Sequence, residues 1–182
     1  MINAMLKEIE LTINNQKTGE TISSIYFGGG TPSLLSENYI GDILNTISKK
    51  CSVDEDVEIT LEANPEDLTS EYLRMVQRLG INRLSIGVQG LKDSVLNDLN
   101  RKQSSTDVFW VLDQASRLFS NISVDLILGL PGVSADEWKD LIAQVVHWPI
   151  SHVSVYFLTV HEETPLYFRV KKNEFALQTD DH

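Results

Sequence analysis

Apolar residues alternate between two spacings along this chain. Five short runs rich in β-branched and aromatic residues predict strands, at 22–27, 57–63, 82–88, 122–128 and 152–158. Between these runs, apolar residues recur every three or four positions, which is typical of one face of an amphipathic helix. The clearest helical patterns lie at 37–50, at 69–79, from 134 to about 146, and over the first sixteen or so residues. The pattern therefore predicts an opening helix followed by about five strand-helix repeats.

This alternation predicts an α/β protein built on a parallel sheet. The expected strands are about 25 to 40 residues apart, which leaves room for the crossover helix that parallel strands require. A doubly wound sheet and part of a (βα) barrel both satisfy the pattern. Since no low-complexity linker divides the sequence, we expect one domain at 1–170 and a polar tail at 171–182.

Composition and charge exclude several classes of protein. The 182 residues carry a net charge of −11, which argues against a nucleic-acid partner because phosphate contacts need clustered lysine and arginine. There is no signal-peptide block and no apolar run of about 18 residues, so we predict a cytoplasmic chain without a membrane span. Cys51 is the single cysteine, and the four histidines lack ligand spacing. We therefore predict no metal site within this chain.

Polar residues gather where the predicted strands end. They are Gly28–Gly30 after the first strand, Glu62 and Asn64 at the second, Gln89 at the third, Asp125 within the fourth, and Tyr156 and Thr159 at the fifth. In both candidate architectures the ligand site is built at the carboxyl ends of the strands. We therefore expect these residues to converge on one small-molecule site.

Each candidate also has a purely structural interpretation. The three glycines either form a turn that needs positive φ or bring bare backbone close to a ligand, and they match neither common phosphate-binding loop. Glu62 and Asp125 stand in apolar strands, where a carboxylate needs an arginine partner or a ligand ammonium or hydroxyl group. Gln89 and Arg101 carry weaker signals, as a loop anchor and a surface cation.

Six motifs taken together resemble one family. They are YFGGGTPSLL, ITLEANPEDLT, GINRLSIGVQ, LNRKQ, VDLILGLPG and HVSVYFLT. Their order and approximate spacing are similar to those of the oxygen-independent coproporphyrinogen III oxidase-like family of radical S-adenosylmethionine (SAM) proteins, the HemN and HemW group. The resemblance covers about 22–170 and implies a partial TIM barrel of (βα) units.

The resemblance implies a SAM site in this chain. Its residues would be Gly28, Gly29, Gly30, Thr31, Glu62, Gln89, Arg101, Asp125 and Thr159. In the family the glycine motif binds the methionine amino group through backbone oxygens, and Glu62 would contact polar groups of the cofactor. Gln89 and Arg101 would hold its ribose or carboxylate end. Asp125 would lie at the ribose or adenosine side, and the backbone of Thr159 would meet the adenine.

One family feature is missing from the sequence. Family members bind a [4Fe-4S] cluster through a CxxxCxxC loop after the first barrel strand, and Cys51 stands alone in a helix-to-strand connection. The resemblance thus implies a member shortened at both ends, in which a cluster is expected only in the complete protein. By itself this chain is not expected to perform radical chemistry, and no catalytic residue is assigned to it. Its strand at 22–27 is expected to form an exposed edge that favours self-association.

The resemblance leaves three functions open. A HemW-like haem chaperone is favoured by HVSVYFLTVHEETPL, whereas LNRKQ with Gln103 is closer to the pattern of the oxidase that converts coproporphyrinogen propionates to vinyl groups. The third is an inert barrel fragment. We favour the HemW-like function, with a porphyrin or haem as the partner of the complete protein.

Overall fold

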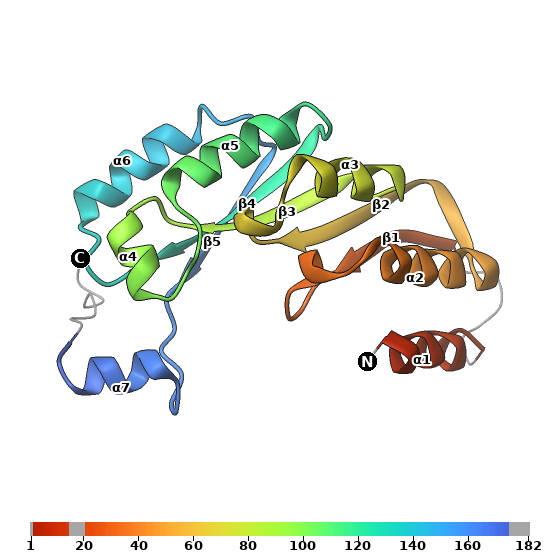
Figure 1. Cartoon of the computed structure of the whole chain (residues 1–182), viewed down its shortest axis with the longest axis horizontal. Helices are drawn as coiled ribbons and strands as arrows, with labels where there is room; N and C mark the ends of the chain where they lie inside the picture. Colours follow the sequence, from red (N-terminus) through yellow and green to blue (C-terminus); the bar gives the residue numbers. More distant parts are fainter. Residues whose placement is uncertain (1, 15–20, 175–182) are drawn as a thin grey trace.

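A curled sheet of five parallel strands organises the protein (Figure 1). The computed structural model describes residues 2–14 and 21–174. The strands are β1 (Thr21–Phe27), β2 (Ser52–Ala63), β3 (Arg83–Gln89), β4 (Asn121–Leu128) and β5 (His152–Phe157). They lie in the sheet in the order β1-β2-β3-β4-β5, and every neighbouring pair is parallel. Because a doubly wound sheet reverses its strand order and this sheet does not, the structure is a half-barrel.

Seven α-helices connect or flank the described strands. They are α1 (Ile2–Asn14), α2 (Glu37–Lys50), α3 (Ser70–Arg78), α4 (Asp93–Asp98), α5 (Ser105–Ser116), α6 (Ala135–Val145) and α7 (Pro165–Lys171). Helices α2, α3 and α6 confirm their predictions within one residue at each end, which is the usual uncertainty of helix boundaries. Helix α1 confirms the opening helix, whose expected last residues lie outside the described part. The sequence pattern did not single out α4, α5 or α7.

Strand β2 is longer than the apolar run that predicted it. It begins at Ser52, five residues before the predicted start, and its first half is polar. In that half the register pairs Thr21 with Ser52 and Ile22 with Val53 before it shifts. A ladder of backbone hydrogen bonds does not require apolar side chains, so the hydrophobic pattern missed this part of the strand.

The two faces of the sheet differ in character. Leu61, Leu84 and Ile122 are neighbours in the register on β2, β3 and β4, and each is at most 1% exposed. They belong to the core that packs against the helices on the outer side of the sheet (Figure 1). Glu62 and Ser85, also register neighbours, lie on the opposite face. The sheet therefore has an apolar convex side and a polar concave side.

Two predictions concern the ends of the sheet and of the chain, namely self-association through 22–27 and a polar tail at 171–182. In the described part β1 pairs only with β2, and the predicted self-association through 22–27 stays a prediction. Helix α7 crosses the predicted boundary at 170, and residues 175–182 of the predicted tail lie outside the described part. None of the described helices has the length and apolar character needed to cross a bilayer.

A capping box begins helix α6 and also joins it to the loop after β3. The Glu137 amide donates to Ser134 Oγ at 3.2 Å, and the Ser134 amide donates to Glu137 Oε2 at 2.7 Å. Lys92 Nζ donates to Glu137 Oε1 at 2.6 Å and to the Gly132 carbonyl at 2.7 Å. The bond from Lys92, followed by those from Ser134, lowers the pKa of Glu137 from 4.5 to about 2.

Replacing Lys92 by methionine is expected to change how stability depends on pH. The lowered pKa means that this contact stabilises the protein above pH 4.5 and that its contribution disappears as pH falls towards 2. The melting temperature of Lys92→Met should thus lie below wild type at neutral pH, and the two should converge in acid. Lys139→Met, which removes an exposed pair with Asp136 on the same helix, is the control. A Lys92→Met difference that persists down to pH 2 would contradict the assignment.

Candidate functional site

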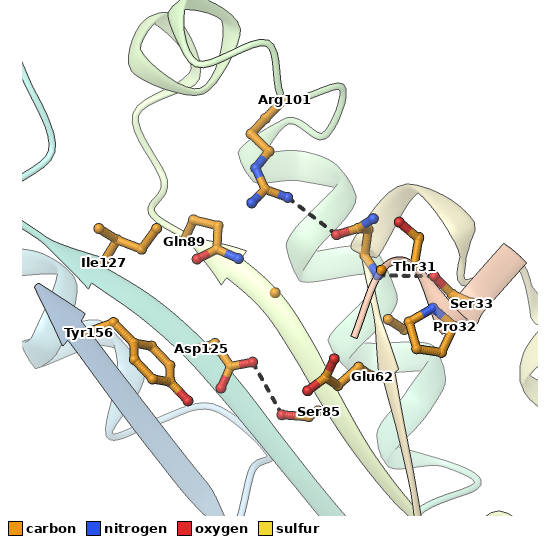
Figure 2. A pocket seen from close by; sticks show the side chains of 14 residues that line it. Thr31, Pro32, Ser33, Glu62, Ser85, Gln89, Arg101, Asp125, Ile127 and Tyr156 are labelled. Atoms are coloured by element: carbon orange, nitrogen blue, oxygen red, sulfur yellow. Dashed lines mark hydrogen bonds between the residues drawn. The ribbon is translucent and has the colours of Figure 1, made fainter. Parts of the chain in front are cut away.

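A cavity of about 450 Å³ lies at the carboxyl ends of the strands, on the concave side of the sheet (Figure 2). Its volume is within the range of small-molecule sites. It is lined by Gly30, Thr31, Pro32, Ser33, Glu62, Ala63, Asn64, Ser85, Gly87, Gln89, Arg101, Asp125, Ile127 and Tyr156. All five strands or the loops that follow them contribute, so segments far apart in the sequence meet there.

Six of the nine predicted site residues line this cavity: Gly30, Thr31, Glu62, Gln89, Arg101 and Asp125. Gly28 and Gly29 lie directly beside it, because the Gly29 amide donates to Glu62 Oε2 at 3.1 Å. Thr159 is exposed in the loop after β5 and does not line this cavity, although its neighbour Leu158 lines an adjoining one. The predicted contact of the Thr159 backbone with adenine stays a prediction.

Neither carboxylate of the cavity has a cationic partner in the described part of the chain. Glu62 Oε1 accepts from the Tyr26 hydroxyl at 2.9 Å, and Asp125 Oδ2 accepts from Ser85 Oγ at 3.2 Å. Among the described residues, no lysine, arginine or histidine lies within ion-pair distance of either side chain. The arginine-partner interpretation of these carboxylates is therefore not observed, and both charges face the cavity unneutralised.

Gly28 and Gly29 after β1 are required for different reasons, a close contact at the first and a positive φ at the second. A Cβ atom at Gly28 would lie 2.8 Å from Tyr26 Cε1 and 3.1 Å from Glu62 Cδ, so a side chain there would push against the carboxylate and its partner. Gly29 has φ of +100°, a backbone conformation that side chains rarely adopt. The turn and the close approach are thus both present, and the loop brings bare backbone to the rim of the cavity.

The Tyr26 hydroxyl holds one oxygen of Glu62. The residue is 55% exposed, and the partial burial of its hydroxyl removes some of its contact with water. This desolvation, followed by the hydrogen bond to Glu62, raises the pKa of Tyr26 to about 12. The hydroxyl is therefore protonated at any physiological pH and acts as a permanent donor to the carboxylate.

Arg101 supplies the positive charge of the cavity. Its Nη1 donates to Asn64 Oδ1 at 3.3 Å, which holds the guanidinium over the end of β2 (Figure 2). Figure 2 shows Arg101 on one side of the cavity and the side chains of Glu62 and Asp125 on the other. The cavity thus suits a ligand that carries both an anionic group and cationic or hydroxyl groups.

Sequence reasoning missed several lining residues. Ser85, Gly87, Ser33 and Ile127 line the cavity but were not candidates. A signal existed in β3, where Ser85 and Gly87 alternate with buried Leu84, Ile86 and Val88. This period of two places the small residues on the concave face. A Cβ atom at Gly87 would lie 2.8 Å from Gln89 Nε2, so the glycine makes room for that amide.

The described residues form no cluster of three or more histidine, cysteine and acidic side chains that could hold a metal ion. Cys51 caps the end of α2, just before β2 begins. Because β2 runs from Ser52 to Ala63, this thiol lies on the order of 30 Å from the carboxyl end of the strand. The lone cysteine is therefore remote from the cavity.

Sequence comparisons match this chain to radical SAM proteins. A family model described as the radical SAM superfamily matches residues 5–145. The chain is 36% identical over 179 residues to the heme chaperone HemW of Bacillus subtilis. This alignment covers 97% of the chain and 47% of the Bacillus protein. It is also 36% identical over 163 residues to the mouse protein "Radical S-adenosyl methionine domain-containing protein 1, mitochondrial". That alignment covers 89% of this chain and 37% of the mouse protein. The chain thus spans less than half the length of these two relatives.

The fold comparison agrees. The structure of coproporphyrinogen III oxidase (HemN) from Escherichia coli, described as a radical SAM enzyme, superposes with a TM-score of 0.80 at 25% identity. The match covers 98% of this chain and 42% of that structure. The sheet of five parallel strands in sequential order is therefore part of a known fold. The chain belongs to the radical SAM superfamily and, within it, to the HemN- and HemW-like family.

Proposed function

We propose that this chain binds SAM in the cavity at the carboxyl ends of its strands. The observation that carries the proposal is the pair of carboxylates, Glu62 and Asp125, which lack cationic partners in the described part and face a cavity that also holds Arg101. SAM offers an ammonium, a sulfonium, a carboxylate and a ribose diol. Its charges therefore complement those of the cavity.

The proposal assigns a partner to each group of the ligand. The backbone of Gly28–Gly30 would meet the methionine ammonium, with Glu62 close by. Arg101 and Gln89 would hold the carboxylate or ribose end, because a guanidinium is a strong donor to a carboxylate. Asp125 would accept hydrogen bonds from the ribose side, and the backbone at Thr159 would meet the adenine.

A [4Fe-4S] cluster does not fit the residues of this chain. Such a cluster is held by several cysteine thiolates, and the sequence contains only Cys51. Replacing Cys51 by serine should leave SAM affinity unchanged.

For the complete protein we propose a HemW-like role in haem metabolism, with haem or a porphyrin as the partner. The Bacillus subtilis relative named heme chaperone HemW supports this role. Coproporphyrinogen III oxidation is the alternative, supported by the likeness to HemN. A cytoplasmic location stays our prediction, and one relative is a protein named as mitochondrial.

Isothermal titration calorimetry of this chain with SAM tests the first proposal. We expect saturable binding of one equivalent, and absence of heat with a correctly folded chain would overturn it. For the complete protein, a shift of the haem absorbance band on titration supports the chaperone role. Product formation from coproporphyrinogen supports the oxidase. If neither haem binding nor product formation is observed, the interpretation as an inert barrel fragment is favoured.

Tyr26→Phe is expected to weaken SAM binding about fivefold, because it removes one net hydrogen bond that holds the Glu62 carboxylate. The ring is retained, so the melting temperature should change little. Tyr39→Phe, at an exposed position on α2, is the matched control. Equal affinities for Tyr26→Phe and wild type would show that the hydroxyl does not organise the site.

A further inference from the structure

We propose that Gln103 is a positioning residue that holds Gln89 and Arg101 at the SAM site. This inference rests on the proposed function. Gln103 is only 2% exposed, and its Nε2 donates to the carbonyls of Gly87 at 3.1 Å and Val88 at 2.8 Å. These are the two residues before Gln89 on β3. The orientation of the amide follows, since the reverse orientation would place its oxygen against two acceptors.

The end of β3 needs such support. The register between β3 and β4 shifts between Gly87 and Gln89, and Gln89 has φ of 66°. Positive φ is uncommon for a residue with a side chain and persists only where the surrounding structure imposes it. The two bonds from Gln103 hold the carbonyls directly before this residue. They thereby fix the direction in which the Gln89 side chain enters the cavity.

The same side chain anchors the segment that carries Arg101. The Arg101 amide donates to the Leu96 carbonyl at the end of α4, at 2.8 Å. Directly after Gln103, a capping box between Ser104 and Asp107 begins α5. The residues in between therefore have little freedom, and Gln103 ties them to β3. Arg101 is two residues away and reaches the cavity from this tethered segment.

The side-chain amide of Gln103 lowers the stability of the protein, because its oxygen is buried without a partner in the described part. Among the described residues, no donor lies within hydrogen-bond distance of Gln103 Oε1, although the atom is buried. A buried acceptor without a partner lowers stability, and an apolar side chain of similar length would avoid that cost. We infer that the amide is needed for its two N–H donors at the end of β3.

Calorimetry of Gln103→Met with SAM tests the inference. We expect about tenfold weaker binding, because Gln89 and Arg101 lose their fixed placement. The control is Gln77→Met, which removes a bond of the same kind, from Gln77 Nε2 to the Leu118 carbonyl at 2.6 Å, at an exposed position outside the cavity. It should leave the affinity unchanged. Gln103→His keeps one ring donor and should recover part of the loss, to about threefold weaker than wild type.

A double-mutant cycle separates positioning from general stability. In an Arg101→Ala background, Gln103→Met should weaken binding much less than it does in wild type, whereas its effect on melting temperature should be the same in both. Wild-type affinity in Gln103→Met would overturn the positioning role, and the full additional loss in the Arg101→Ala background would overturn its action through Arg101. If wild type itself does not bind SAM, the proposed function fails and this inference fails with it.

Discussion

Glu62→Gln is expected to weaken SAM binding about a hundredfold while the melting temperature stays close to that of wild type. The substitution keeps the shape of the side chain and removes its charge. That charge faces the cavity, and in the described part it meets a hydroxyl and a backbone amide but no cation. A cationic ligand group would then lose its counter-charge. Calorimetric titration of both proteins measures the difference.

The matched control for this prediction is Glu66→Gln. Glu66 is exposed on the short helix after β2, outside the cavity, so its loss of charge should not change the affinity. Asp125→Asn should act in the same direction as Glu62→Gln, since Asp125 also lacks a cationic partner in the described part. Wild-type affinity in both cavity variants would contradict the placement of SAM in this cavity.

Leu84→Ala is expected to lower the free energy of unfolding by about 3 kcal/mol. Leu84 lies on the central strand β3, is fully buried, and has Leu61 and Ile122 as register neighbours on the same face. Truncating it removes buried apolar area and leaves a cavity that a packed sheet and its helices fill only in part. Urea denaturation followed by circular dichroism measures the change.

Leu34→Ala is the control for the core prediction. Leu34 is 72% exposed in the short helix after the glycine loop, so its truncation should change the free energy of unfolding by less than about 0.5 kcal/mol. Similar losses for the two variants would mean that the β3 face is not the centre of the core.

Much of the fold could be predicted because strands and helices leave different periods in the sequence. The run at 82–88 and the helical pattern at 37–50 both appear in the structure within one residue of their expected ends. The first half of β2 could not be predicted this way, because its side chains are polar and only its backbone pairs. The choice between half-barrel and doubly wound sheet also needed the strand order, which local periodicity does not contain.

The site was predicted in part, for a related reason. A charged residue within an apolar strand is conspicuous, and Glu62 and Asp125 both line the cavity. Ser85 and Gly87 are small and occur in every kind of context, so they gave a signal only through their alternation with buried neighbours. Gln103 entered the sequence reasoning only as part of the LNRKQ motif, and its contacts with β3 could not be predicted from it.

By itself, the sequence determined the strand-helix alternation, the family and the candidate residues, because local periodicity and ordered motifs depend only on which residues follow one another. The tertiary structure alone decided which candidates share one cavity and which partners they have. It showed Glu62 held by Tyr26 and Gly29, Thr159 outside the main cavity, and Gln103 buried against the end of β3. These facts depend on strand order and register, which bring together residues separated by tens of positions in the chain.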